Sequence, residues 1–249
     1  MSTEIDTRVT ADLHPQIIDT LPGVTADMAV HVGQAVDALT SAYTYVGSIY
    51  DMRDAAFADP ELTPEGALLK VDDYANAKLA AVTTKIDGAV KNMTRSIDAL
   101  TADMKSAVKE LAGKQVSGEV RAHIKAAGPD RIKLLEQAVA DKDTEVLSSV
   151  CGAPPMLSGI SKEMHEFFTL RYNEMTKPET AKRLKALTAA RDHLNERGGL
   201  VLREMMKAVG TVPIITQDKA GISRISGHIR PQDVRAKRNA SRDVYKKLA

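Results

Sequence analysis

The sequence predicts an all-α protein, elongated and organised around a helical hairpin or bundle, and two observations carry this prediction. From residue 65 to residue 111, apolar side chains recur every three or four positions without an intervening proline, which is the periodicity of one face of an α-helix. Only 4% of the residues are aromatic and none is tryptophan. The interior must therefore consist of Ala, Leu, Val, Ile and Met, a set that favours close helix packing over a β-sandwich.

Composition narrows the class of protein further. With 43% apolar and 27% charged residues, the chain matches ordinary folded, soluble proteins. The single cysteine, Cys151, cannot form an internal disulfide, and the first residues lack the basic start and apolar core of a secretory signal. No apolar run is long enough to span a bilayer. We therefore expect a reducing, cytoplasmic origin and no membrane partner.

Residues 1–24 are the first of four predicted segments, an N-terminal arm. They are polar, contain His14-Pro15 and Leu21-Pro22-Gly23, and show no sustained period, which is typical of irregular structure. Thr25 is then a candidate N-cap, because a helical pattern follows it from Ala26 to about Ala56.

Residues 25–112 are the second segment, a long helical hairpin. Asp59-Pro60 ends the first helix, after which Thr63 can cap the second. Pro64 occupies the first turn, where its missing N–H costs nothing, and Glu65 complements the helix dipole. At about 1.5 Å per residue, a helix over 65–111 would reach roughly 70 Å. Such a helix must pack along other long helices, in this chain or in a partner.

The apolar face of the long helix is a candidate oligomer seam. Its residues are Leu79, Val82, Ile86, Val90, Met93, Ile97, Leu100 and Met104. Their spacing averages about 3.6 residues and mixes heptad with eleven-residue intervals, which fits a nearly straight bundle better than a tight supercoil. Two interpretations stay open: the seam faces the first helix inside one monomer, or it also forms a homo-oligomeric coiled coil.

Residues 113–210 are the third segment, a helical bundle. The pattern predicts short helices over 119–127 and 130–141 and another from near Thr144. The stretch from Val150 to Gly159 is an apolar loop, whereas exposed loops are generally polar. We expect it to fold onto a helical surface or a partner.

The remainder of this segment predicts two more helices. The first, over 160–175, carries Phe167, Phe168 and Tyr172, which we interpret as local core. The second is long and opens with the capping-box spacing Thr176-Lys177-Pro178-Glu179. Gly198-Gly199 lies inside it, so we expect either a bend or the close approach of another backbone there.

Residues 211–249 are the fourth segment, an extended linker and a basic tail. Thr211 to Thr216 is short and extended and could pair as an isolated strand or act as a linker. Residues 219–249 contain nine Lys or Arg and two Asp, a net charge of +7, whereas the other 218 residues carry a net charge of −6. From Pro231 onward the spacing predicts a basic amphipathic helix with Val234 on its apolar stripe.

The tail holds the candidate partner-binding residues. They are Arg230, Arg235, Lys237, Arg238, Arg242, Tyr245, Lys246 and Lys247. Three interpretations remain open: a merely solvated end, sequence-blind nucleic-acid binding through phosphate neutralisation, and docking on an acidic protein partner. We favour the protein partner, because the apolar stripe adds contact area and aromatic residues for stacking on bases are almost absent.

No motif of catalysis accompanies these features. Neither nucleotide-binding glycine pattern occurs, and the six histidines lie far apart. Cys151 has no basic neighbour and is interpreted as a buried, inert thiol. Asp72-Asp73 diverge on a helix and are interpreted as solvated surface. The sequence thus predicts a protein that is not an enzyme, with no catalytic residue, no cofactor and no metal.

One resemblance adds to this interpretation. The Ala-rich hairpin, Glu119 to Lys125, Val146 to Gly159 and Lys182 to Leu187 together resemble uncharacterised proteins of tailed phages and prophages, over about residues 60–210. The resemblance implies a virion or head-assembly part, scaffolding-like, in the virion or the host cytoplasm. Such proteins are often helical oligomers with a basic end that engages coat protein. The resemblance also implies that the partner is a second copy of the chain, another virion protein, or both.

Overall fold

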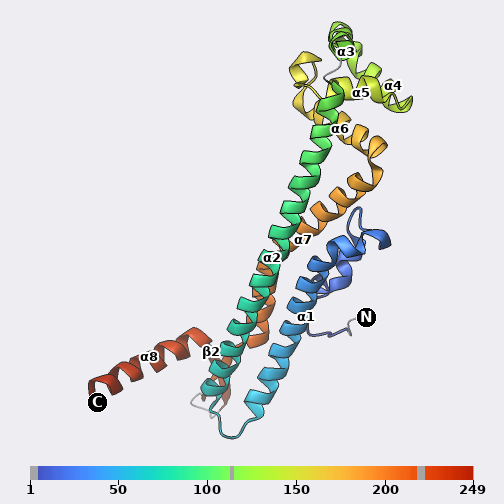
Figure 1. Cartoon of the computed structure of the whole chain (residues 1–249). Coiled ribbons are helices and arrows are strands. Elements are labelled where there is room, and N and C mark those ends of the chain that lie inside the picture. The colour runs from blue at the N-terminus through green and yellow to red at the C-terminus, as the bar shows by residue number, and fades with distance from the viewer. Residues whose placement is uncertain (1–4, 113–114, 218–221, 249) are drawn as a thin grey trace. The chain divides into compact units, whose positions relative to one another are not determined.

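A computed structural model describes residues 5–112, 115–217 and 222–248 of the chain. Figure 1 shows that most of these residues lie in helices, and the only sheet among them has two strands. The predicted all-α class is therefore confirmed. Within the described residues, no helix combines the length and the apolarity needed to cross a membrane.

The secondary structure elements follow the predicted order with one addition, a second strand. The elements are α1 (Ala29–Ala58), α2 (Pro64–Ala112), α3 (Gln115–Ala126), α4 (Arg131–Ala140), α5 (Thr144–Cys151), α6 (Lys162–Thr176), α7 (Pro178–Val209), β1 (Val212–Gln217), β2 (Ser223–Ile229) and α8 (Pro231–Leu248). Short 3₁₀ turns lie at Ala11–Leu13, Pro15–Thr20, Ala26–Met28, Gly128–Asp130 and Pro155–Leu157. The very long helix predicted over 65–111 is confirmed as α2.

The chain forms two compact units. Unit 1 contains residues 1–18, 33–90 and 192–249, and unit 2 contains residues 19–32 and 91–191. Each unit combines residues from several of the four sequence segments, because α2 and α7 each contribute residues to both units.

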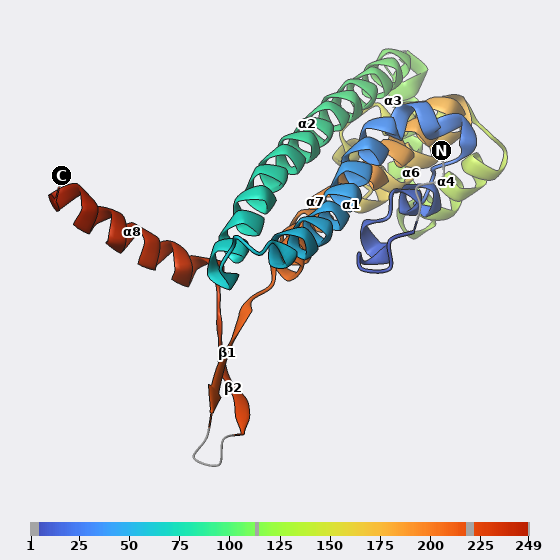
Figure 2. The same cartoon turned by 90° about the horizontal axis from the view of Figure 1, so that it is seen from below.

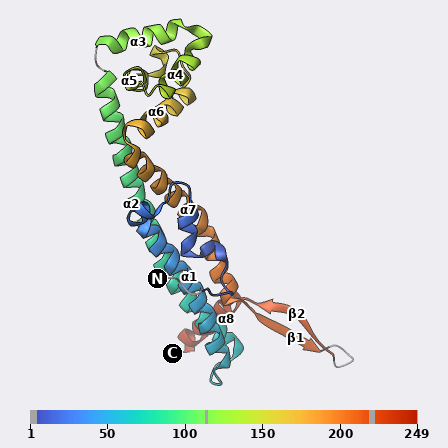
Figure 3. The same cartoon turned by 90° about the vertical axis from the view of Figure 1, so that its right-hand side faces the viewer.

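Unit 1 is built on the helical hairpin of α1 and the first half of α2. These helices run antiparallel, side by side, in Figures 1 and 3. The Thr63 hydroxyl accepts the N–H of Gly66 at 3.1 Å, so the predicted N-cap of α2 is confirmed. Between the helices, the Tyr74 hydroxyl donates to Ser48 at 3.2 Å, and Lys78 lies 4.6 Å from the centre of the Tyr45 ring.

The N-terminal segment, described from Ile5 onward, contains two 3₁₀ turns and packs on α1. Leu13 and Ile18 are fully buried, and the Tyr43 hydroxyl accepts the N–H of Asp6 at 2.7 Å. Arg8 binds Asp51 at 2.8 Å. Thr25 is extended but makes no cap bond to the backbone; its hydroxyl donates to the Asp27 carboxylate instead. The predicted cap is therefore wrong, and a 3₁₀ turn precedes α1.

Unit 2 surrounds a core contributed by α2 to α6. Its buried residues are Val108, Ile124, Leu135, Ala138, Leu147, Val150, Cys151, Ile160, Phe168 and Tyr172. Asp143 caps α5 by accepting the N–H groups of Glu145 and Val146, and Ser161 caps α6. The helices predicted over 119–127, 130–141 and 160–175 are therefore present, with boundaries that differ by a few residues.

Two local predictions in and near unit 2 need correction. The first concerns the aromatic cluster: Phe168 and Tyr172 are core residues as predicted, but Phe167 is 45% exposed. The apolar loop does lie against a helix as expected, because its 3₁₀ turn Pro155–Leu157 contacts α3 and Val150, Ser158 and Ile160 are buried, while Met156 and Leu157 are exposed.

The second correction concerns the start of α7. Thr176 is the final residue of α6, where its hydroxyl donates to the Tyr172 carbonyl, so no capping box forms. Helix α7 continues through Gly198 and Gly199. No atom outside the helix lies within 4 Å of where a Cβ would stand on either glycine, so of the two expected alternatives the close backbone approach is excluded, and a bend stays a prediction.

Candidate interaction surface

The most exposed part of unit 1 is formed by β1, β2 and α8, which we call the hairpin–α8 module. Figures 2 and 3 show the two strands leaving the end of α7, extending away from the helices of this unit and returning to α8. The strands pair antiparallel, with Val212 opposite Ile229 and Ile215 opposite Ile225. An irregularity between Ile214 and Ile215 leaves Ser226 as an extra residue in β2, a β-bulge.

The hairpin presents apolar side chains to solvent on both faces. Four isoleucines are exposed in this way: Ile214 (40%), Ile215 (65%), Ile222 (57%) and Ile225 (64%). The register places Ile215 and Ile225 on one face and Ile214 on the other. A two-stranded hairpin is only marginally stable in water, and strands with apolar residues on both faces are typical of buried sheet. This part of the chain therefore has the properties of a surface that another molecule covers.

A tight junction fixes the start of the hairpin to α1. Gly210 has a φ of +67°, a conformation that favours glycine. The Arg53 guanidinium donates to the carbonyl oxygens of Val209 and Thr211, the second at 3.3 Å, and lies 5.2 Å from the centre of the Phe57 ring. A methyl group on Gly210 would overlap that guanidinium. The module is thus anchored at its first residue by a backbone clamp.

Helix α8 is anchored to α2 by Arg235. Its Nε donates to the Asp72 carboxylate at 2.8 Å, and its Nη2 contacts Asp72 and also Asp73, the latter at 2.5 Å. The bond to Asp72 raises the pKa of Arg235. The prediction that Asp72 and Asp73 are merely solvated surface is therefore wrong. Both carboxylates bind Arg235, a residue that the sequence predicted to bind another molecule.

Three other cations of α8 are exposed and make no ion pair with the described residues. Lys237, Arg242 and Lys246 are exposed, and no ion pair joins them or Arg238 to any residue that the structure describes. The Nε of Arg238 is buried without an acceptor. Arg230 instead binds Asp233 within the first turn, at 3.6 Å.

The predicted apolar stripe of α8 is only partly visible. Val234 is buried, in agreement with the stripe. The side chains of Tyr245, Lys247 and Leu248 lie outside the described residues. The role of the tail residues in partner binding stays a prediction.

A groove of about 550 Å³ lies where the module meets α2 and α7. Its apolar lining includes Leu79, Leu202, Met205 and Met206, with Arg230 and Arg235 at its rim. Leu202 and Met206 are exposed. Methionine adapts to irregular partners, so the groove extends the apolar part of the module's surface.

Acidic residues, opposite in charge to the cations of α8, cluster at the turn between α1 and α2. Residues 51–73, which we call the acidic turn, contain seven Asp or Glu and two Lys or Arg. Asp51 binds Arg8, Asp59 lies 3.8 Å from Lys70, and Asp72 with Asp73 binds Arg235. Phe57 is exposed beside them. The sequence contained this cluster, but only the fold brings it to the base of α8.

The candidate oligomer seam is largely buried within the single chain. Val82, Ile86, Met93, Ile97 and Met104 are buried, and Leu79, Val90 and Leu100 are half-buried. The interpretation that the seam packs inside one monomer therefore accounts for these side chains. A coiled coil between copies stays a prediction.

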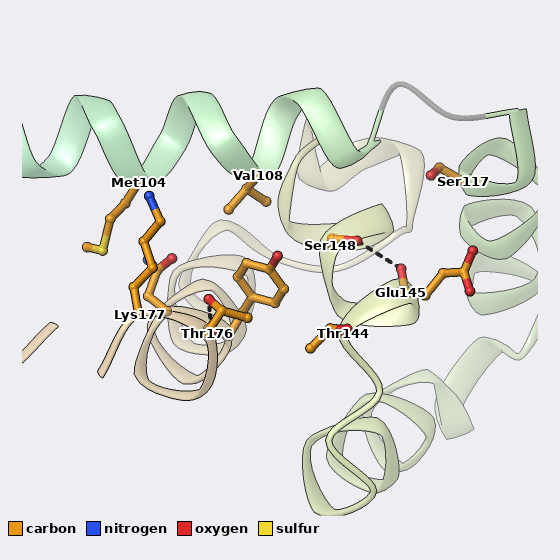
Figure 4. Close-up of a pocket in the computed structure, with 10 residues that line it drawn as sticks. Met104, Val108, Ser117, Thr144, Glu145, Ser148, Thr176 and Lys177 are labelled. Carbon is orange, nitrogen blue, oxygen red and sulfur yellow. Dashed lines mark hydrogen bonds between the residues drawn. The ribbon is translucent and has the colours of Figure 1, made fainter. Parts of the chain in front are cut away.

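Unit 2 contains a cavity of about 510 Å³, drawn in Figure 4. It is lined by Met104, Val108, Ser117, Thr144, Glu145, Ser148, Tyr172, Asn173, Thr176 and Lys177. The Ser148 hydroxyl donates to the Glu145 carbonyl at 3.1 Å, and Lys177 binds Asp103 at 2.9 Å. The first bond lies within α5, whereas the ion pair of Lys177 with Asp103 joins the end of α6 to α2.

The remaining chemical candidates of the sequence have structural positions. Cys151 is buried, and burial raises the pKa of its thiol to about 11, in line with the predicted inert thiol. Among the described residues, no group of three or more His, Cys, Asp or Glu side chains is arranged to hold a metal ion. His165 bonds to the Ala153 carbonyl at 3.0 Å.

Comparison with known proteins identifies no relative: neither a protein-family model, nor a curated protein, nor a solved structure matches this chain.

Proposed function

We propose that this chain is a non-enzymatic structural or assembly protein of the tailed-phage virion or of capsid assembly, and that its hairpin–α8 module engages an acidic protein partner. The observation that carries the proposal is the combination of unpaired cations and exposed isoleucines in one module. Cations steer and orient an acidic partner, while exposed apolar side chains supply the contact area for a lasting complex. The phage assignment rests on the sequence resemblance alone.

The rest of the fold fits this role. Long helices such as α2 provide a rigid support for a binding element at one end of a unit. The cavity of unit 2 is lined by groups that bond helix carbonyls and neighbouring carboxylates. We therefore place the function of the chain in binding.

The alternative is a nucleic-acid-associated binding module that uses the same cations. Lys237, Arg242 and Lys246 could neutralise phosphates in a salt-sensitive manner. This alternative assigns no role to the exposed isoleucines of the hairpin, which carry no charge. The protein partner is therefore the better account of the whole module.

Binding of two polyanions to the full chain distinguishes these functions. One probe is a fluorescent peptide of alternating glutamate and valine, and the other is a DNA duplex of equal charge. The proposal predicts that Ile225→Ser weakens peptide binding about tenfold, the equivalent of about 1.4 kcal/mol of lost apolar contact, and leaves DNA binding unchanged. Ile132→Ser, a change at an exposed isoleucine of unit 2, is the matched control.

Removal of residues 219–249 should abolish peptide binding. Tight DNA binding with a steep salt dependence, together with weak peptide binding that ignores Ile225, would support the nucleic-acid alternative. Mass spectrometry of particles produced by a phage or prophage that encodes the chain tests the assembly assignment, which predicts its peptides in procapsids or virions.

A further inference from the structure

The hairpin–α8 module needs a partner surface with two properties, carboxylates for its free cations and an apolar contact for its isoleucines. The chain itself carries such a surface. Residues 1–218 have a net charge of −6, against +7 for residues 219–249. Within the acidic turn the excess of carboxylates is greatest, and the exposed Phe57 ring lies among them.

One contact already shows that these two surfaces are complementary. Arg235 of α8 binds Asp72 and Asp73 of the acidic turn inside a single chain. This contact uses only the first turns of α8, and Figures 1 and 2 show the rest of the helix continuing away from α2. Within the described residues, Lys237, Arg242 and Lys246 make no ion pair with the acidic turn of their own chain.

Carboxylates of the acidic turn also remain free. Asp54 and Glu61 are exposed, and no ion pair joins either of them, or Glu65, to a residue in the described ranges. One set of unpaired cations and one set of unpaired carboxylates thus lie on different surfaces of the same unit. A second copy can satisfy both sets at once.

We propose that the hairpin–α8 module of one copy docks on the acidic turn of a second copy, so that the chain assembles head to tail. This inference rests on the proposed function, because it names the partner of the same surface. Association of two different surfaces is heterologous, and it produces a ring when the rotation closes or an open filament when it does not. The interface differs from the long-helix seam, whose side chains are already largely buried within one chain.

Light scattering of the purified full chain measures this assembly. At about 0.05 M salt the mass is expected to be at least twice the 26.9 kDa of one chain, and it should fall toward one chain at about 0.5 M salt, where exposed charges are screened. Lys237→Glu with Arg242→Glu should give a monomer at low salt. Asp54→Lys with Glu61→Lys should do the same.

The decisive variant combines the two module substitutions and the two acidic-turn substitutions in one chain. The reversed charges are again complementary, so association should return at low salt. Lys91→Glu with Lys105→Glu changes the net charge as much as the module substitutions do, on exposed positions of α2 in unit 2, and it should leave the mass unchanged. Far-ultraviolet circular dichroism of each variant verifies that the helices remain folded.

Three outcomes would overturn the inference. They are a wild-type monomer at low salt, an oligomer that survives the module substitutions, and a four-substitution chain that stays monomeric while folded. The proposed function fails separately, through the acidic peptide. A monomeric chain that still binds the peptide retains the function and loses only the second copy as partner.

Discussion

Arg235→Met should release α8 from α2, and the structure permits an estimate of the effect. The Arg235 side chain is 32% exposed and that of Asp72 is 18% exposed, so the pair is neither fully solvated nor deeply buried. Exposed pairs contribute about 0.2–1 kcal/mol, whereas hydrogen bonds to charged groups contribute about 1.5–3 kcal/mol. We expect an intermediate value of about 1–2 kcal/mol. Methionine keeps much of the apolar stem, so the loss is mainly that of the charge pair.

Hydrogen exchange of the α8 amides measures this release. A loss of about 1–2 kcal/mol predicts about 5- to 30-fold faster exchange at the amides around Val234. Arg242→Met, which removes an exposed cation with no ion pair in the described structure, should leave the exchange rates unchanged when both variants are measured at about 0.5 M salt, where the chain is expected to be a monomer. Asp72→Asn should give a similar acceleration, and its effect should not add to that of Arg235→Met. Equal acceleration by Arg242→Met, or none by Arg235→Met, would refute the assigned anchor.

Three further predictions concern stability. Gly210→Ala should lower the free energy of unfolding by about 1–3 kcal/mol because of its positive φ and the guanidinium beside it, whereas Gly198→Ala in the open middle of α7 should raise it by up to about 1 kcal/mol; denaturant titration measures both. Phe168→Ala should cost about 3–5 kcal/mol and the exposed Phe167→Ala about 1 kcal/mol or less, in the same titration. Burial and the nearby Arg197 charge lower the pKa of His193 below 6.5. The unfolded state therefore binds more protons, and stability should fall as the pH drops through 6.5 toward the lower pKa of the folded state. His193→Asn should reduce this fall, which thermal melts at pH 7.5 and 5.5 measure.

The long helices were predictable because their signals are local. The apolar period of residues 65–111 and the cap at Thr63 depend on neighbours within a few positions, and both are present as expected. The predicted capping box at Thr176 did not form, because two local bonds competed for the same hydroxyl. The Thr176 side chain donates to the carbonyl four residues earlier in α6 and so belongs to the end of that helix.

The candidate surface was only half predictable. The basic helix was visible in the sequence, but strand β2 carried only a weak signal. Ile225 and Ile229 keep the two-residue alternation of a strand, but Gly227 between them weakens strand preference and only two apolar side chains mark the pattern. Gly221, a residue type that favours turns, and the isoleucines before and after it in the sequence were the available signal. The anchor between Arg235 and Asp72 joins residues 163 positions apart, and no local pattern reports such a contact.

Zero-length crosslinking of mixed isotopic copies tests the central claim most directly, namely that the hairpin–α8 module is where this chain binds another protein molecule. Unlabelled and ¹⁵N-labelled chains are mixed, treated with a carbodiimide that joins lysine to carboxylate, and digested for mass spectrometry. We predict that crosslinks between copies join Lys237 or Lys246 to residues of the acidic turn. Crosslinks between copies that instead concentrate on Lys85, Lys91 and Lys105 of α2 would contradict the account and identify the long helix as the interface.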